Sequence, residues 1–285
     1  FPYTTLFRSD LRTPAGLGTD IIRGISITST TALSTYKLYY NTIYMNASSS
    51  AANFGSTGLF HTYSATATTA SLDMRNNIID NASSANGTGL AISFRRSAAT
   101  DLNNYATTSN NNLFFGTSGV FNNGTTNYAT LAAFQGVSGA RETNSKSQNP
   151  TFASTTGSNS NYLHFASGAT NLAGGNAQVI SGYAVDYDGD TRDASTPDIG
   201  ADEFVQGTIS SPTISGFTPT TVCVTGGQLV TISGTSLDTV TAVTFNGLSA
   251  SISSQNATTL VAISPVGLTD GTIVVTNAAG SATSG

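Results

Sequence analysis

Charged side chains are scarce in this chain of 285 residues: Asp, Glu, Lys and Arg make up 9% of it, against about 25% in ordinary soluble domains. Its 10 basic residues are outnumbered by 15 acidic ones, giving a formal net charge of −5, which argues against binding nucleic acid. A single cysteine, Cys223, excludes an intramolecular disulfide framework. No apolar run approaches the roughly 20 residues that would cross a bilayer.

Serine, threonine, asparagine and glycine take the place of the missing charges. A low-charge chain rich in these residues and lacking disulfides is typical of secreted bacterial surface proteins. We therefore predict an extracellular protein, secreted or displayed at the cell surface, that is monomeric and has no membrane span.

Residues 1–9, FPYTTLFRS, differ in origin from the rest in our interpretation. One reading frame of a common sequencing-library adapter encodes this nonapeptide, so we predict that it is an artefact and that the chain is a translated fragment. On this interpretation the natural N-terminus and any signal peptide are missing, and the chain can also be truncated after Gly285.

Three segments can be superposed at a fixed offset of 35 residues: YNTIYM, RNNIID and NNNLFF, at residues 40–45, 75–80 and 110–115. This register predicts a turn column of Asn41, Asn76 and Asn111 and an inward column of Ile43, Ile78 and Leu113. An apolar residue two places after a recurring asparagine indicates stacked repeats, in which each coil buries the inward face of the next.

Each repeat contains short stretches that alternate in polarity, such as Leu72 and Met74 on one face with Asp73 and Arg75 on the other. Polar loops without a hydrophobic period separate these strands. We predict an all-β fold in which every repeat is one coil of a parallel β-helix. One short helix is expected in residues 128–137, with Leu131 and Phe134 facing inward.

Seven acidic residues lie between Asp186 and Glu203. Asp186, Asp188 and Asp190 alternate as at the start of a calcium loop, although Gly189 sits one position too early for an EF-hand. One interpretation is bound calcium. The other, compatible with it, is a structural cap that plugs the open end of the solenoid. In that cap Arg192 pairs with a carboxylate, and Ile199 and Phe204 supply the apolar surface.

The motif PDIGADEF after DGDTR, together with SQNPTF and the NNI-type coils, resembles the C-terminal end of right-handed parallel β-helix proteins. These have the pectate-lyase-like architecture found among secreted proteins of Bacteroidetes-type bacteria, and the resemblance covers residues 36–204. It implies a β-helix with a C-terminal cap at residues 10–205. It does not imply an activity, because this architecture hosts lyases, hydrolases, epimerases and non-enzymatic surface proteins.

A linker at 206–211 and a second domain at 212–285 complete the predicted organisation. Short alternating strands and the hairpin turn Asn246-Gly247 predict a β-sandwich. The segments PTISGFTP, GGQLVTISGTSL, VTAVTFNG and GTIVVTNAAGSATS resemble the IPT/TIG family of immunoglobulin-like domains. In bacterial surface proteins such a domain implies a spacer or a binding module.

Candidate chemistry in the coils is sparse. The catalytic candidates are Asp73, Arg75 and Asp80, although a surface ion pair also explains the first two. The ligand-binding candidates are Arg95, Arg96 and Tyr44, which could contact an acidic glycan or stack on a sugar, or else form a solvated strand end and core packing. Two histidines, His61 and His164, are expected to be structural.

The function that this pattern predicts is non-catalytic: adhesion, glycan contact or surface display. No triad, phosphate-binding loop or Cys/His metal motif accompanies the candidates, and calcium is the one cofactor that the sequence suggests. The alternative is a polysaccharide lyase or glycoside hydrolase with a β-helix groove.

Overall fold

The computed structural model describes residues 18–98, 101–166, 169, 171–205 and 210–285. The chain divides into two compact units near residue 205. The predicted adapter segment, residues 1–9, and residues 206–209 of the predicted linker lie outside the described residues.

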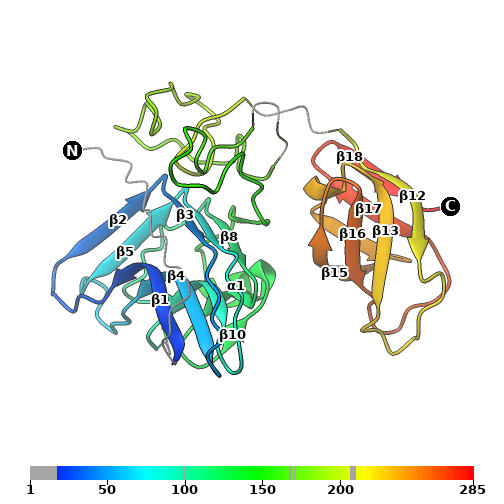
Figure 1. Ribbon diagram of the computed structural model, residues 1–285, viewed down its shortest axis with the longest axis horizontal. Helices are drawn as coiled ribbons and strands as arrows, with labels where there is room; N and C mark the ends of the chain where they lie inside the picture. The colour runs from blue at the N-terminus through cyan, green and yellow to red at the C-terminus, as the bar shows by residue number, and fades with distance from the viewer. Residues whose placement is uncertain (1–17, 99–100, 167–168, 170, 206–209) are drawn as a thin grey trace. The chain divides into compact units, whose positions relative to one another are not determined.

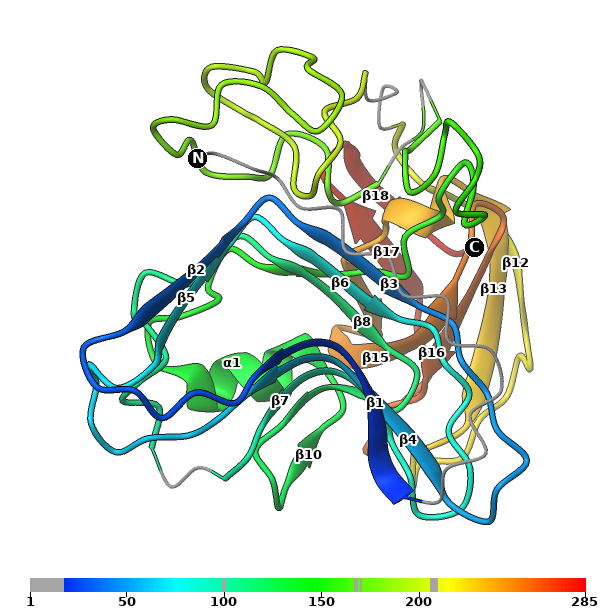
Figure 2. The ribbon, with the colours of Figure 1, turned by 60° about the vertical axis from the view of Figure 1, so that its left-hand side comes forward.

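The first unit is a stack of parallel coils with three sides (Figures 1 and 2). One side contains β1, β4, β7 and β9 in parallel with antiparallel β10 at its end; a second contains β3, β6, β8 and β11; the third contains β2 and β5. The bounds are β1 Gly18–Ile27, β2 Thr35–Tyr39, β3 Thr42–Met45, β4 Phe54–His61, β5 Ser71–Arg75, β6 Ile78–Asn81, β7 Ala91–Arg96, β8 Leu113–Gly116, β9 Gly119–Asn122, β10 Asn127–Tyr128 and β11 Lys146–Ser147. This solenoid confirms the predicted all-β fold class.

Columns of apolar side chains fill the interior of the stack. Leu59, Phe94 and Phe121 are register partners in successive coils, and the rings of Phe94 and Phe121 have centroids 5.3 Å apart. All three are buried. Full burial of each such side chain is worth about 1.5–3 kcal/mol, and only stacking supplies it, because one coil leaves its inward face open.

The register of the first two coils differs from the prediction by one residue. Ile43 pairs with Ile79, while Ile78 pairs with Thr42 and Leu113. The predicted inward column of Ile43, Ile78 and Leu113 is therefore wrong: Ile78 and Leu113 stack on each other outside the core cluster, and Ile43 belongs to the neighbouring inward column. A shift of one residue moves a strand's side chains to the opposite face, so Ile78 faces outward while Ile43 faces the core.

The corner between β2 or β5 and the next strand explains the shift. Tyr40, Asn76 and Asn111 hold equivalent corner positions, with φ of 55°, 60° and 56°. Asparagine adopts this left-handed conformation more readily than most residues, so Asn76 and Asn111 form the predicted turn column, but Tyr40 takes that position in the first coil.

A second asparagine column lies one residue after the corner. Asn41 donates from Nδ2 to Oδ1 of Asn77 at 2.8 Å, and Asn77 donates in the same way to Asn112 at 2.9 Å. All three are buried. The predicted partner of Asn41 was Asn76, whereas its actual partner is Asn77. We call this column the asparagine ladder.

A short helix, α1 (Leu131–Ser138), covers one end of the stack. It begins after Thr130, whose hydroxyl accepts a hydrogen bond from the Ala133 amide, as expected of an N-cap. Phe134 is fully buried, with its ring centroid 4.2 Å from that of Phe121 and 5.9 Å from that of Phe114. The predicted helix and the inward position of Phe134 are confirmed.

The acidic segment lies along a side of the stack instead of plugging its end. Between residues 148 and 205 the described part of the chain contains isolated bridges but no helix or strand. Gly200 donates its amide to the Asn76 carbonyl, and a Cβ added at Gly200 would lie 2.6 Å from Cδ1 of Ile78. The outward Ile78 is thus covered by this segment, which we call the flank segment, residues 172–205.

The second unit is a seven-stranded antiparallel sheet in the order β12-β13-β16-β15-β14-β17-β18. The bounds are β12 Thr213–Thr218, β13 Leu229–Thr235, β14 Ala242–Phe245, β15 Leu248–Gln255, β16 Thr259–Ile263, β17 Ile273–Asn277 and β18 Gly280–Thr283. The first half of β15 pairs with β14 and its second half with β16, so the sheet folds around one core. Asn246 and Gly247 have φ of 45° and 79°, which confirms the predicted hairpin turn. Within the described residues, no helix has the length and apolar character needed to span a membrane.

Candidate functional site

The alternation of β4 between the inner and outer faces of the sheet is interrupted at Gly58. A Cβ added at Gly58 would lie 2.6 Å from Cγ2 of Ile79, so this position faces the interior. Leu59 belongs to the interior cluster as well. Two consecutive inward residues leave Thr57 and Phe60 both on the outer face.

A group of interacting side chains occupies this outer face, and we call it the basic face. It consists of Asp20, Arg23, Thr57, Phe60, Arg95 and Asn122. The guanidinium carbon of Arg23 lies 3.4 Å from the centroid of the Phe60 ring, a cation–π distance. Arg23 also donates to Oδ2 of Asp20 from Nη2 at 2.8 Å and from Nε at 3.1 Å.

Arg95 joins the basic face from the next coil. It donates from Nε to the Thr57 hydroxyl at 3.0 Å and from Nη1 to Oδ1 of Asn122 at 3.2 Å. Burial lowers the pKa of Arg95, and Asp20, 3.7 Å away, opposes that change. Two guanidinium groups therefore share one carboxylate, leaving an excess of one positive charge. The sequence prediction included Arg95 but missed Asp20 and Arg23.

Arg96 points the opposite way, into the solenoid. It is fully buried, its Nη2 donates to the Asn104 side chain, and burial lowers its pKa to about 10. The alternation of the strand separates it from Arg95, so Arg96 offers no surface to a glycan. Its neighbour in the preceding coil, His61, is also buried, as predicted, with Nε2 2.8 Å from the Ala70 carbonyl.

Asp73 and Arg75 form a bidentate ion pair on the β2-β5 sheet. The Nε–Oδ1 and Nη2–Oδ2 distances are 2.8 and 2.6 Å. The Tyr39 hydroxyl and the Thr108 hydroxyl donate to the same carboxylate at 2.5 and 3.0 Å. Burial raises the pKa of Asp73, but the bonds from Arg75 and Tyr39 outweigh it, and the net shift is downward. Both oxygens of the Asp73 carboxylate are therefore occupied by hydrogen bonds from within the protein.

Asp80 lies apart from that pair, on β6. It is fully buried, and neither carboxylate oxygen has a hydrogen-bond partner among the described residues. Burial raises its pKa well above the usual range, because desolvation disfavours the charged form of the carboxyl group. The structure therefore does not unite Asp80 with Asp73 and Arg75.

Tyr44, the aromatic ligand-binding candidate, is half-buried and packs edge-to-face against Phe152, with ring centroids 5.8 Å apart. Its register partner is Asp80, and burial raises its pKa. Phe152 therefore covers part of the ring surface that a sugar would need.

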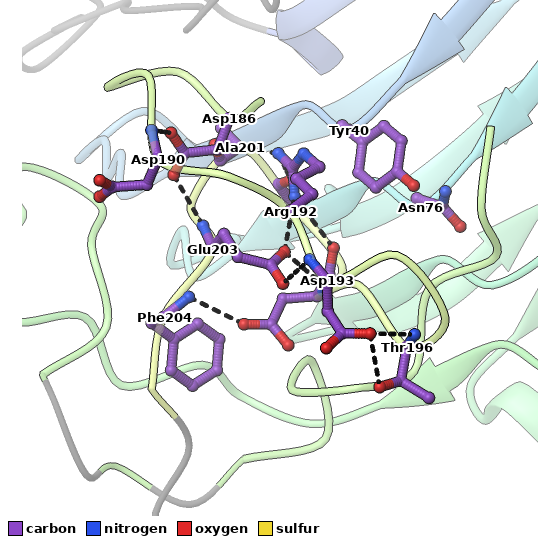
Figure 3. Close-up of polar contacts among 12 residues, drawn as sticks. Tyr40, Asn76, Asp186, Asp190, Arg192, Asp193, Thr196, Ala201, Glu203 and Phe204 are labelled. Carbon is purple, nitrogen blue, oxygen red and sulfur yellow. Dashed lines mark hydrogen bonds and ion pairs between the residues drawn. The ribbon is translucent and has the colours of Figure 1, made fainter. Parts of the chain in front are cut away.

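Arg192 anchors the flank segment to the solenoid (Figure 3). Its Nη1 lies 3.2 Å from Oε2 of Glu203, its Nη2 donates to the Gly200 carbonyl at 2.9 Å, and its guanidinium carbon lies 4.1 Å from the Tyr40 ring centroid. Arg192 is 4% exposed. The predicted pairing of Arg192 with a nearby carboxylate is confirmed.

Both carboxylate oxygens of Asp186, the first predicted calcium ligand, accept hydrogen bonds from backbone amides. Oδ1 accepts from the amides of Asp188 and Asp190, and Oδ2 accepts from the amide of Glu203, each at 2.9 Å (Figure 3). Asp188 is turned toward His164, and the Asp190 side chain is exposed. Calcium bound by these three aspartates stays a prediction.

A different set of metal-ligand side chains comes together beside this loop. Donor atoms of His164, Asp188 and Asp202 lie within 4.8 Å of one another, the one such trio in the part of the chain that the structure describes. Nε2 of His164 is 3.1 Å from Oδ2 of Asp188, and Nδ1 is 3.9 Å from Oδ1 of Asp202. Sequence reasoning missed this set, because nothing in the spacing of three distant residues signals that their loops meet.

Comparison with known proteins identifies one of the two units. No curated protein is significantly similar in sequence to the chain. Residues 212–285, whose antiparallel strands and Asn-Gly hairpin enclose a single core, match the model of the IPT/TIG domain, so the second unit is an immunoglobulin-like domain of that family.

Proposed function

We propose that this chain is part of a secreted or cell-surface structural and adhesive protein whose solenoid contacts acidic glycans through the basic face. The low-charge composition and the IPT/TIG domain at 212–285 support an extracellular role. In this proposal the IPT/TIG domain acts as a spacer or as a second binding module.

The observation that carries the proposal is the arrangement of Arg23, Phe60 and Arg95 on one sheet. Guanidinium groups recognise carboxylates and sulfates through paired N–H donors. The side chain of Arg23 is 28% exposed and reaches solvent, whereas that of Arg95 is 13% exposed, with its Nη2 buried, so Arg23 is the contacting group and Arg95 adds positive charge beside it. Because Phe60 and Asp20 hold Arg23 in place, little side-chain entropy is lost on binding.

A polysaccharide lyase or hydrolase is the second candidate, favoured by the presence of Asp20, Arg23 and Arg95 on the same face. Such chemistry needs a carboxylate or base that is free to exchange a proton with the sugar. Asp20 already accepts hydrogen bonds from Thr57 at 2.6 Å and from Arg23. Adhesion therefore ranks first.

The test is binding of the purified chain to an acidic polysaccharide, polygalacturonate, and to neutral dextran by affinity electrophoresis at low and high salt. We expect retardation by the acidic polymer alone, weakening with salt because exposed charges are screened. Arg23→Ala should lose roughly tenfold in affinity, a step of about 1.4 kcal/mol. Arg75→Ala, on a different sheet, is the matched control and should retain binding.

Absence of binding to the acidic polymer, or equal binding by wild type and Arg23→Ala, would reject this role for the basic face. Release of unsaturated uronate or of reducing ends in the same samples would promote the enzyme alternative. Loss of that turnover in Asp20→Asn would then identify the carboxylate involved.

A further inference from the structure

Three loops that are distant in sequence converge at His164. Residues 161–165, 186–190 and 201–204 supply His164, Asp188 and Asp202 in turn. Described residues 148–205 lack helices and strands, so side-chain and backbone bonds must hold these loops together. The backbone at His164 is held by one such bond, because its carbonyl accepts a hydrogen bond from the Ala153 amide at 2.8 Å.

Negative charge is in excess where the loops meet. Asp202 is 9% exposed and lies beside Asp186 and Asp188, and its Oδ1 is 3.9 Å from Nδ1 of His164. The nearby Arg192 is engaged by Glu203. Carboxylates crowded in a desolvated place favour binding of a cation.

The donor set fits a transition metal better than calcium. Calcium takes six to eight oxygen ligands, whereas zinc accepts imidazole nitrogen and carboxylate oxygen together. Bonds of about 2.0–2.2 Å place adjacent ligand atoms of a tetrahedral zinc site roughly 3.3 Å apart. The distance of 3.1 Å between Nε2 of His164 and Oδ2 of Asp188 is close to this value. Asp202 lies nearer the other ring nitrogen, with Oδ1 3.9 Å from Nδ1, so an ion bound to Nε2 draws Asp202 in from within the 4.8 Å that encloses the three donor atoms. The Asp188 side chain is 39% exposed and can rotate to complete the set.

The residues around the trio orient two of its members. Asp202 accepts the Phe165 amide through Oδ2 at 2.9 Å, which leaves Oδ1 turned toward the imidazole. Asp186, through its three backbone bonds, shapes the loop that presents Asp188 and ties it to Glu203. Outer groups of this kind fix ligand orientation in metal sites.

We propose that His164, Asp188 and Asp202 bind one divalent transition-metal ion, with zinc as the best fit, and that the ion clamps the three loops together. Asp186 is a positioning residue in this site. Three protein ligands leave a coordination position for water.

The experiment uses the whole chain without a polyhistidine tag, stripped with chelator and titrated with zinc, manganese and calcium chlorides. Calorimetry and thermal melting report binding, and cobalt substitution reports the ligand geometry through its visible spectrum. We expect one equivalent of zinc and a rise in the melting midpoint. Affinity should fall at least about tenfold in His164→Gln and in Asp188→Asn. Asp190→Asn, exposed and in the same loop, is the matched control and should bind zinc as the wild type does.

Circular dichroism of the metal-free variants distinguishes loss of a metal ligand from loss of folding. If His164→Gln misfolds, the result rests on Asp188→Asn, because the Asp188 side chain is exposed and its replacement should leave the fold intact. Absence of zinc binding up to millimolar concentration would overturn the proposal, as would equal zinc affinity in wild type and Asp188→Asn. Calcium binding that disappears in Asp190→Asn but persists in His164→Gln would also overturn it, in favour of an oxygen-only loop.

Discussion

The side-chain amide of Asn112 donates to both carboxylate oxygens of Glu142, at 3.2 and 3.0 Å. Asn112 is the last member of the asparagine ladder, so its Nδ2 has no asparagine of a following coil as a hydrogen-bond acceptor. Glu142 is fully buried and also accepts the hydroxyls of Tyr105 and Ser145. An acidic side chain thus ends the ladder, because Glu142 supplies the acceptors that an asparagine would supply in a further coil.

Replacing Glu142 should test this end of the ladder. Glu142→Leu removes the acceptor shared by the Tyr105 and Ser145 hydroxyls and by one Nδ2 hydrogen of Asn112, whose other hydrogen keeps the Met74 carbonyl. We expect a loss of about 3 kcal/mol or more of unfolding free energy. Glu142→Gln keeps one acceptor oxygen, and the two hydroxyls can rotate, so its cost should be smaller. Urea denaturation at neutral pH measures both; equal costs would show that the carboxylate does not act as the shared acceptor.

The corner residue Asn76 should be sensitive to both conformation and hydrogen bonding. The side-chain Oδ1 of Asn76 accepts a hydrogen bond from the backbone amide of Gln178 at 2.9 Å, and its Nδ2 donates to the backbone carbonyl of Gln178 at 2.8 Å. These two bonds hold the flank segment against the corner. We expect Asn76→Ala to cost about 2–3 kcal/mol, combining two lost bonds with left-handed strain. Asn76→Gly relieves the strain and should cost about 1 kcal/mol less. Chemical denaturation measures the unfolding free energy of both variants. If the glycine variant is no more stable than the alanine variant, the left-handed φ at this position does not contribute to the loss.

Two glycines of the flank segment allow steric fit to be separated from backbone strain. Gly200 and Gly189 have φ of 104° and 93°, so alanine is strained at either. A Cβ at Gly200 would meet Ile78 at 2.6 Å, whereas a Cβ at Gly189 meets nothing within 4 Å.

Gly189→Ala should therefore cost about 1 kcal/mol from the backbone alone. Gly200→Ala adds displacement of the segment from the sheet, a further 1–3 kcal/mol or so. Limited proteolysis of residues 172–205 and thermal melting of both variants check the difference. Similar cleavage rates would argue that the segment does not pack tightly on Ile78.

Stability should depend on pH through His61. Burial lowers its pKa from the ordinary 6.5 to about 4. Between these values the unfolded chain binds a proton that the folded chain does not, so the contribution is complete above pH 6.5 and is lost as pH falls toward 4. The full difference amounts to about 3 kcal/mol. Urea denaturation from about pH 7 down to about pH 4 should show a shallower fall in His61→Gln than in the wild type. Parallel curves would exclude His61 as the source.

How far the fold could be predicted depends on which interactions are local. The recurrence of asparagine before an apolar residue identified the coil because left-handed geometry is a property of a single residue, and Asn76 and Asn111 show it. The register could not be obtained in the same way. Tyr40 holds the left-handed corner of the first coil, where an asparagine was expected, because the packed sheets around it and the Gln178 carbonyl that accepts its hydroxyl compensate for the strain.

The candidate sites also divide into features set by local sequence and features set by packing between coils. The alternation of Asp73 and Arg75 predicted their ion pair, since residues two apart share a strand face. Arg95 and Arg96 were both ligand-binding candidates, and the alternation of β7 sends Arg95 outward and buries Arg96. The basic face needs Asp20 and Arg23 from another coil, and no local pattern links them to Arg95.

The all-β class, the stacked coils, the short helix around Phe134 and the IPT/TIG domain could all be predicted from the amino-acid sequence, because they follow from periodicity, turn chemistry and family motifs along the chain. Three features became visible only in the folded protein: the position of the flank segment, the contact of Glu142 with the end of the asparagine ladder, and the approach of His164 to Asp188 and Asp202. These outcomes depend on the packing of loops without periodic structure, where the partner of each polar group is set by shape and burial across many residues of separation.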